Sequence, residues 1–530
     1  MSRAVTLLAA VVLLAGAARA EVPGGFDARV EQIRKEVGVP GLSVAIVAHG
    51  QVTLARGYGV RRLGEDAPVD ADTIFQLGSV GKAFTTAALA VLVDRGQIDW
   101  DDPVTKHIPW FQMYDPWVTR EMKVIDLLVH RSGLGLGAGD LMFVPRSNLS
   151  RAETVRRVRY LKPATSFRSA YAYDNVLYAV AGQLIEEVSK KTWERFVREE
   201  VLVPAGMRTA TSDRVDRRQT ANRAWPHTRL DGPMHGMGTQ KALDDSGKAE
   251  FDPELGQNAA PAGAVAASAN DMGRWMLIQL ARGALPGDSG RLFSEAQSRQ
   301  MWTPRVPMPI SASSGPTAAA TPQFNAYALG WSERDYRGHR LITHTGAVFG
   351  AQAVIMLIPE REVGFSVAIN CEDGEAALGI AYELLDHYLD RPKYDWAAAW
   401  QQVVKERDEK AVKLLKEQTA APAAVGPSLP LERYAGEYAD SWYGPIAIAH
   451  RDGRLTIDFK QTPGMTGVLT HWQYDTFRAE WRDPLIEPAY LTFSLNADGG
   501  IDRIGLRAVS PLADFSFDYQ DLDFRPAARK

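Results

Sequence analysis

The sequence predicts an α+β fold: an antiparallel sheet flanked by helices, a helix-rich region, and a small antiparallel sheet or barrel at the C-terminal end. Three observations predict it. Strand-like patterns lie near both ends of the first 390 residues, and helical patterns fill the middle. After an Ala- and Pro-rich stretch the residue pattern becomes strand-like again. Terminal strands that pair into one sheet beside an inserted helical region give an α+β domain.

Two hairpins are expected in the large domain. The stretch 41–60 has two β-rich runs around His49-Gly50, a pair that suits a tight turn. The stretch 352–370 has a second pair of apolar runs, with a turn expected at 359–361. These runs supply the two ends of the predicted sheet.

Helices are expected in four places. The stretch 79–95 is rich in Ala and Leu and stops at Gly96. Apolar residues recur every three or four positions over 175–202, which predicts one helix there. Two further helical patterns cover 375–390 and 394–418.

The remaining stretches set the predicted domain limits. Residues 208–260 are polar and look loop-like, so they could form a lid or a wall of a pocket. A large first domain is expected over 21–418, a linker over 419–430 and a β domain over 431–530. Asp452-Gly453 between alternating runs is a strong hairpin signal in that last domain, and its aromatic residues are expected to fill a small core.

The first twenty residues resemble a secretory signal. Arg3 precedes a short apolar run, and Ala18-Arg19-Ala20 is a small-x-small cleavage site, so cleavage after Ala20 is expected. A membrane anchor is the weaker alternative because the apolar run is short. The expected location is therefore periplasmic or secreted, with no stable membrane insertion.

Composition excludes some classes of function. The chain has 530 residues, 45% of them hydrophobic, and a formal net charge of −4, so no nucleic-acid partner is expected. The single cysteine, Cys371, permits no intrachain disulfide and is expected to be buried. Oligomeric state is not readable from the sequence.

The stretch LGSVGKAFTT, residues 77–86, places Ser79 three residues before Lys82. A helix brings such positions to one face. A serine hydroxyl needs a neighbour to take its proton, and a lysine does so when burial lowers its pKa. Alone the signal is weak, because Ser79 could cap the helix and Lys82 could be solvated.

Two later motifs add to this pair. Tyr173 and Asn175 are two residues apart before a helix, so their side chains point to the same side. Tyr173 could serve as a phenolate base or proton relay. Asn175 could donate a hydrogen bond to a substrate carbonyl. Alternatively, Asn175 or Asp174 caps that helix and Tyr173 packs in the core. In a later strand, Gly346 would let a ligand lie close, and the N–H groups of Ala347 and Ser79 could form an oxyanion hole.

Together, Ser79-x-x-Lys82, Tyr173-x-Asn175 and His344-Thr345-Gly346 resemble the three signatures of the class C β-lactamase and penicillin-binding-protein family of serine hydrolases. The resemblance covers roughly residues 25–390. The tail resembles the small lipocalin-like barrel that often follows this domain.

The resemblance implies a β-lactamase/transpeptidase-like fold and acyl-serine chemistry. Ser79 would attack a carbonyl, Lys82 with Tyr173 would move protons, and Asn175 would orient the substrate. His344, Thr345, Gly346 and Ala347 would line the pocket edge and the oxyanion hole. It implies a small-molecule or short-peptide substrate, and no metal or organic cofactor.

One departure from that family concerns His344. Dedicated β-lactamases usually carry a lysine here, whereas a histidine is mostly neutral at pH 7. Efficient β-lactam hydrolysis is therefore in doubt, and relatives with His are more often esterases, D-amino-acid peptidases and amide hydrolases.

Three functions compete on this sequence. The first is a secreted hydrolase of esters or amides. The second is a penicillin-binding protein or β-lactamase with slow turnover, and the third is an inactive hydrolase domain whose C-terminal domain binds a ligand.

Other charged and aromatic residues have structural interpretations. His227 and His235 are expected to be solvent-exposed rather than metal ligands. His130 is expected to hold a turn, and Arg168 to form a local ion pair.

Overall fold

The computed structural model describes residues 21–248, 253–287, 290–313, 315–420 and 423–527. The predicted signal segment, residues 1–20, lies outside the described residues. None of the described helices is long and apolar enough to cross a membrane.

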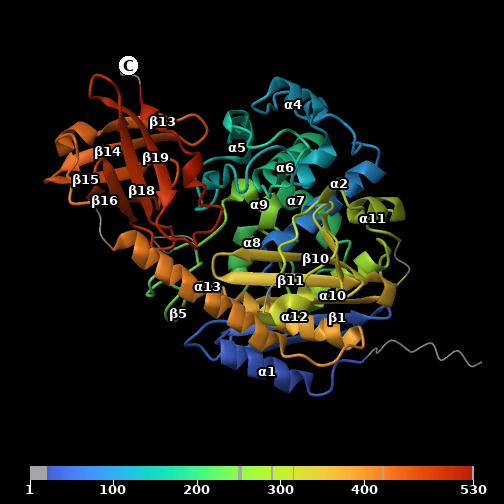
Figure 1. Ribbon diagram of the computed structural model, residues 1–530. Coiled ribbons are helices and arrows are strands. Elements are labelled where there is room, and N and C mark those ends of the chain that lie inside the picture. The colour runs from blue at the N-terminus through green and yellow to red at the C-terminus, as the bar shows by residue number, and fades with distance from the viewer. Residues whose placement is uncertain (1–20, 249–252, 288–289, 314, 421–422, 528–530) are drawn as a thin grey trace, which may run out of the picture.

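An eight-stranded sheet forms the centre of the large domain (Figure 1). Its strands are, in spatial order, β2 Gln51–Gly59, β1 Gly41–Ala48, β12 Val363–Ile369, β11 Ala351–Ile358, β10 His339–Val348, β9 Ser332–Tyr336, β8 Asn325–Tyr327 and β7 Val306–Pro307.

The two chain ends of this domain meet inside the sheet. Strand β1 pairs antiparallel with β12, with Leu42 opposite Ile369, which confirms the predicted pairing of terminal strands. The turn between β1 and β2 has positive φ at His49 and Gly50, as a two-residue hairpin requires. The predicted hairpin between β11 and β12 is confirmed as well.

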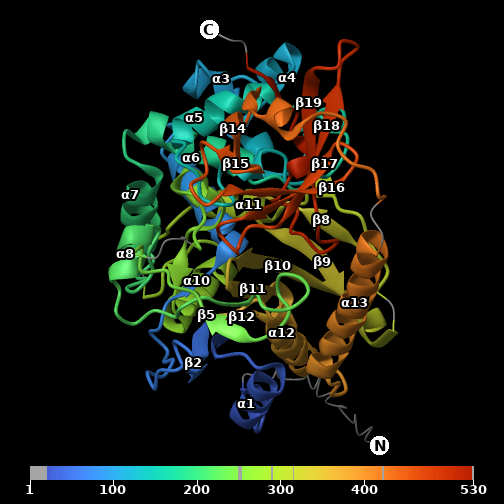
Figure 2. The same ribbon diagram turned by 90° about the vertical axis from the view of Figure 1, so that its left-hand side faces the viewer.

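Helices cover both faces of the sheet and form a separate helical region (Figures 1 and 2). Their bounds are α1 Phe26–Val37, α2 Lys82–Asp94, α3 Val104–His107, α4 Pro116–Glu121, α5 Arg151–Arg157, α6 Val176–Ser189, α7 Trp193–Val197, α8 Arg214–Gln219, α9 Ala260–Gly263, α10 Ala269–Leu280, α11 Glu295–Trp302, α12 Gly374–Tyr388 and α13 Trp396–Thr419.

Strand β1 is buried along its whole length because helices pack on both of its faces. Leu42, Val44 and Ile46 belong to one core with α1 and α12, whereas Ala45 and Val47 belong to the core shared with α2 and α10. Such two-sided burial explains why the strand is a continuous apolar run rather than an alternating one.

The predicted helices are present, with one break. The segment expected over 79–95 begins with a 3-10 turn, Gly78–Gly81, before α2. The single helix expected over 175–202 is wrong, because α6 ends where Lys190 takes a left-handed conformation (φ 59°). Thr192 then starts α7, and its hydroxyl accepts from the Arg195 N–H.

The region 208–260 is more structured than the sequence indicates. It holds α8 and a two-stranded hairpin, β4 His227–Arg229 and β5 Gln240–Ala242. A separate short pairing joins β3 Phe75–Gln76 to β6 Ala266–Ala267. The His227 N–H donates to the Gly350 carbonyl, so the hairpin is attached to the end of β10 and β11.

The C-terminal domain is an eight-stranded antiparallel sheet that nearly closes into a barrel (red in Figure 1). Its strands are, in spatial order, β19 Ile501–Ala508, β18 Ala489–Leu495, β17 Thr476–Trp481, β16 Thr466–Gln473, β15 Arg454–Phe459, β14 Gly444–Arg451, β13 Gly436–Asp440 and β20 Arg525–Pro526.

A bridge between Ile504 and Phe524 joins the two ends of this sheet. The turn at Asp452 and Gly453 has positive φ at both residues, as predicted. The interior is filled by buried aromatic side chains, which confirms the expected core role: Tyr434, Tyr438, Tyr443, Phe459, Phe477, Phe493 and Phe524.

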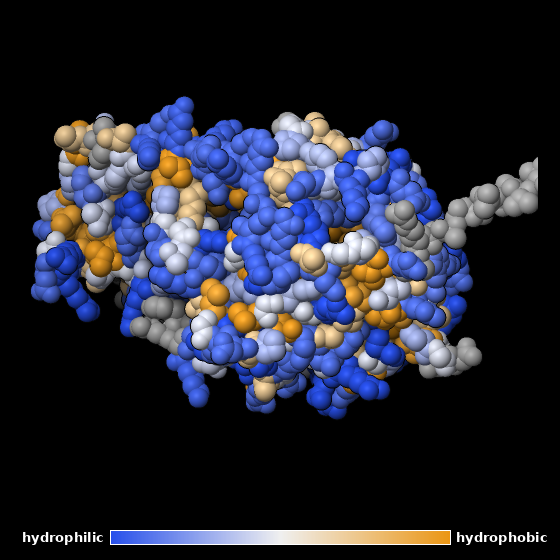
Figure 3. Space-filling view, turned by 90° about the horizontal axis from the view of Figure 1, so that it is seen from below, coloured by the Kyte–Doolittle hydropathy of each residue, from blue (hydrophilic) through white to orange (hydrophobic). Residues whose placement is uncertain are grey.

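Helix α13 runs from the large domain towards the barrel (Figures 1 and 2). Seen from below, the surface is largely hydrophilic, with apolar side chains in scattered patches (Figure 3). Cys371 is buried, as expected.

Candidate functional site

Ser79 lies in the 3-10 turn that precedes α2, directly against strand β10. Gly78 has φ 51°, and a Cβ at that position would lie 2.6 Å from the Ala347 nitrogen. A Cβ at Gly346 would lie 2.8 Å from the Ser79 nitrogen. Glycine is therefore required on both sides of this contact, which brings the backbones of Ser79 and Ala347 together.

Lys82 is fully buried in the first turn of α2, and its amine has three neighbours. Its Nζ lies 2.9 Å from Ser79 Oγ, 2.7 Å from Asn175 Oδ1 and 3.0 Å from the carbonyl oxygen of Ala262 in α9. Burial lowers the pKa of Lys82 to about 7, against an opposing attraction from the Asp140 and Asp174 carboxylates. The solvated alternative for Lys82 is thus wrong.

Asn175 connects Lys82 to a carboxyl group. It occupies the N-cap position of α6, but its side chain makes no cap hydrogen bond, so the capping alternative for Asn175 is wrong. Its Oδ1 accepts from Lys82, and its Nδ2 donates to Asp140 Oδ2 at 2.8 Å. Burial raises the pKa of Asp140 to about 8.

The ring of Tyr173 lies beside the same amine. Lys82 Nζ is 4.8 Å from the Tyr173 ring centre, and 5.0 Å from that of Tyr178. Burial raises the pKa of Tyr173 well above its usual range, although a hydrogen bond with Ser79 opposes this. Tyr173 therefore stays protonated, which disfavours the role of phenolate base and leaves that of a neutral proton relay.

Strand β10 carries the third motif along one side of the site. His344 and Gly346 are buried, whereas Thr345 and Ala347 are exposed. His344 Nδ1 donates to the Thr345 carbonyl at 2.5 Å, and its Nε2 lies 2.8 Å from the Tyr327 hydroxyl. Burial lowers the pKa of His344 to about 3, so the imidazole is neutral near pH 7 and carries its hydrogen on Nδ1.

A cluster of rings around Tyr173 was missed by the sequence reasoning. The His130 ring lies 4.1 Å from that of Tyr173 and 4.5 Å from that of Tyr327. His130 accepts from the Asp174 N–H through Nδ1 at 3.1 Å, in agreement with its expected turn-holding role. Tyr327 and Tyr178 carried no recognisable signal, because aromatic residues before or within regular elements are usually core.

The barrel also reaches this site. The Phe515 ring lies 5.9 Å from that of Tyr173, and Ser516 Oγ donates to Asp140 Oδ2 at 2.9 Å. Asp140, Phe515 and Ser516 were all missed, because no local motif links loops of two different domains.

Two expectations about histidines are wrong. His227 is fully buried, donates to the Asn370 carbonyl and accepts from the Leu63 N–H. His235 is mostly buried and pairs with Glu372 at 3.1 Å. Arg168 forms an ion pair with Asp126 at 2.5 Å, which confirms its structural role, but the partner is 42 residues away in sequence rather than local. Across the described residues no group of acidic, histidine and cysteine side chains could hold a metal ion.

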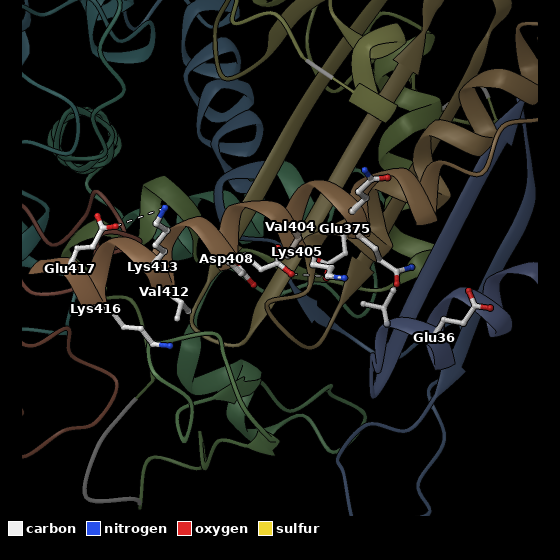
Figure 4. A pocket seen from close by; sticks show the side chains of 13 residues that line it. Glu36, Glu375, Val404, Lys405, Asp408, Val412, Lys413, Lys416 and Glu417 are labelled. Carbon is white, nitrogen blue, oxygen red and sulfur yellow. Dashed lines mark ion pairs between the residues drawn. The ribbon is translucent and has the colours of Figure 1, made fainter. Parts of the chain in front are cut away.

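Two hollows differ in their relation to the site. A hollow of about 1010 Å³ runs along α13 and is lined by charged side chains such as Lys405, Asp408 and Lys413, with no member of the site among its lining (Figure 4). A second hollow, of about 410 Å³, lies between Leu136 and Phe515, beside the ring cluster.

Two family models match the chain. Residues 26–389 match the family model described as Beta-lactamase, and residues 420–526 match one described as Domain of unknown function (DUF3471). The chain is 28% identical to Unguisins hydrolase ungD' of Aspergillus campestris over 445 residues, which are 80% of this chain and 77% of that protein. It is 25% identical to Protein flp of Staphylococcus aureus over 65% of this chain and 62% of that protein.

Two solved structures are similar in fold. The octameric penicillin-binding protein homologue from Pyrococcus abyssi superposes with a TM-score of 0.58 at 19% identity, over 94% of this chain and 99% of that one. SurE superposes with a TM-score of 0.51 at 19% identity, over 95% of this chain and 98% of that one.

The burial of His344 predicts a pH-dependent loss of stability. Its pKa is about 3 in the folded protein and about 6.5 when unfolded, so the unfolded chain takes up a proton that the folded one does not as the pH falls below about 6.5. We expect His344→Asn to weaken the fall in free energy of unfolding between about pH 7 and pH 4, measured by urea denaturation. An unchanged fall would contradict a buried neutral imidazole.

Proposed function

Because the chain belongs to the Beta-lactamase family, whose members are typically serine hydrolases, we propose that it hydrolyses ester or amide bonds of small molecules or short peptides through an acyl-serine intermediate. The observation that carries this proposal is the buried amine of Lys82, 2.9 Å from Ser79 Oγ.

The neighbours of Lys82 determine what its amine does. A neutral amine has two hydrogens and one lone pair. The oxygens of Asn175 and Ala262 can only accept hydrogen bonds, so they take the two hydrogens. The lone pair is then directed at the Ser79 hydroxyl, and with a pKa of about 7 the amine is well suited to accept its proton.

The proposed reaction follows from these positions. Ser79 Oγ attacks the substrate carbonyl as its proton moves to Lys82, and the N–H groups of Ser79 and Ala347 stabilise the oxyanion. Lys82 and the neutral hydroxyl of Tyr173 then pass this proton to the leaving group. Water then attacks the acyl group, and its proton passes through Tyr173 and Lys82 to Ser79 Oγ. This step releases the acid and restores Ser79.

The substrate class is inferred from His344. A neutral, hydrogen-bonded imidazole offers no fixed positive charge to a substrate carboxylate, so we favour esters and amides over β-lactams. The similarity to a protein named as a hydrolase of unguisins is compatible with a hydrolytic reaction.

We expect Ser79→Ala to abolish turnover and labelling by a fluorophosphonate probe, because no other group replaces Oγ. Lys82→Met should lower kcat by about 10³-fold or more, since proton transfer typically contributes 10²–10⁴. The assay uses p-nitrophenyl esters, D- and L-amino-acid p-nitroanilides and nitrocefin.

Lys106→Met, at an exposed lysine paired with Asp102, is the matched control and should keep full activity. Labelling that persists in Ser79→Ala would contradict the assigned nucleophile. A burst of acylation with no turnover would point instead to a penicillin-binding protein with slow deacylation, and a folded protein without any labelling to a binding role for the C-terminal domain.

We also propose that the protein is secreted or periplasmic, on the evidence of the signal-like residues 1–20. The expected mature N-terminus is Glu21, measured by N-terminal sequencing of the protein from culture medium and periplasm. A cytoplasmic product that retains Arg3 would contradict this.

A further inference from the structure

The segment 137–141 lies between the candidate site and the barrel. On the site side, the Gly137 N–H donates to the Tyr173 carbonyl at 2.8 Å. On the barrel side, a Cβ at Gly137 would lie 2.5 Å from the Phe515 carbonyl oxygen, so the two backbones touch. The segment is thus fitted to both domains at once.

A buried carboxylate of the barrel holds the same segment. The N–H groups of Gly139 and Leu141 donate to Asp518, at 2.7 and 3.0 Å. The Asp518 side chain is fully buried. These two bonds fix the backbone on either side of Asp140, and therefore the place of its carboxyl group.

Asp140 in turn connects the barrel to Lys82. One oxygen, Oδ2, accepts from Ser516 Oγ at 2.9 Å and from Asn175 Nδ2 at 2.8 Å. The other oxygen, Oδ1, is buried without a hydrogen-bond partner among the described residues. The chain of contacts continues from Asn175 Oδ1 to Lys82 Nζ at 2.7 Å.

The orientation of the Asn175 amide matters for the base. With Nδ2 held by Asp140, the amide oxygen faces Lys82 and takes one of its hydrogens. A flipped amide would present an N–H to the amine and compete with the Ser79 hydroxyl for its lone pair. An acceptor at Asp140 is what excludes the flipped state.

We propose that Asp140 and the barrel residue Ser516 are positioning residues, which hold the Asn175 amide so that the Lys82 lone pair is directed at Ser79. The inference rests on the proposed hydrolase function. It makes the barrel a part of the active site, joined through Asp140, rather than only an appended domain.

The contact of Arg157 with the barrel supplies a control. Arg157 donates to the Trp442 and Tyr443 carbonyls, at 2.9 and 2.5 Å, and touches no member of the site. Arg157→Gln weakens the joint between the domains without altering the Asp140 chain of contacts, so it should leave kcat unchanged.

The experiment measures kcat and KM of the full-length protein for the best ester of the panel. Ser516→Ala and Asp140→Ala should lower kcat about ten- to hundredfold with little change in KM, because each removes a hydrogen bond that does not touch substrate. Their effects should not add: in an Asp140→Ala background, Ser516→Ala should change nothing. Asp140→Asn keeps an acceptor oxygen and should retain most of kcat.

The pH profile separates positioning from mere stability. Protonated Lys82 favours the ionised form of Asp140 against its burial, and the Asp140 carboxylate in turn favours protonated Lys82. Removing that carboxylate in Asp140→Asn or Asp140→Ala should therefore move the acidic limb of kcat/KM to lower pH. A change in stability alone would lower the profile without moving it.

Wild-type kcat in Ser516→Ala, or equal losses in Ser516→Ala and Arg157→Gln, would overturn the proposal. Additive losses in the double variant would overturn it too. These results leave the proposed function untouched as long as the wild-type protein is labelled at Ser79, whereas an unlabelled wild type would contradict the function itself. If Asp140→Ala does not fold, the kcat values of Ser516→Ala and Asp140→Asn still test the proposal.

Discussion

The burial of one amine without an ion-pair partner among the described residues is the constraint on which the rest of the site depends. Lys82 has no exposed surface, and its hydrogen-bond neighbours are a hydroxyl, an amide oxygen and a backbone carbonyl. A lysine in such surroundings loses its proton readily, because desolvation penalises the ammonium form. The surrounding protein buries Lys82 and directs the lone pair of its neutral amine at the Ser79 hydroxyl.

The sheet, the helical region and the barrel each contribute one side of the site around Lys82. The sheet brings β10 against the turn of Ser79, where Gly78 and Gly346 allow the backbones to touch. The helical region supplies Tyr173 and Asn175 from the segment just before α6. The barrel closes the remaining side through the loop that carries Phe515 and Ser516.

Most of the regular structure could be predicted, because periodic apolar patterns and turn residues act locally. The hairpins at His49 and Asp452 are examples. The pair Ser79 and Lys82 was found because a helical turn brings them together. Asp140 and Ser516 could not be found, since they are 376 residues apart and meet only through the docking of two domains. The burial of His227 was missed for the same reason: its partners Asn370 and Leu63 are distant in sequence.

The most direct test of the account is the pH dependence of Ser79 phosphonylation by a fluorophosphonate, followed by mass spectrometry of the active-site peptide. If a neutral Lys82 is the base, the second-order rate constant should fall tenfold per pH unit below about pH 7 and level off above it. A limb near pH 10 would mean that Lys82 is an ordinary solvated lysine, and a flat profile would mean that another group activates the serine; either result would contradict the account.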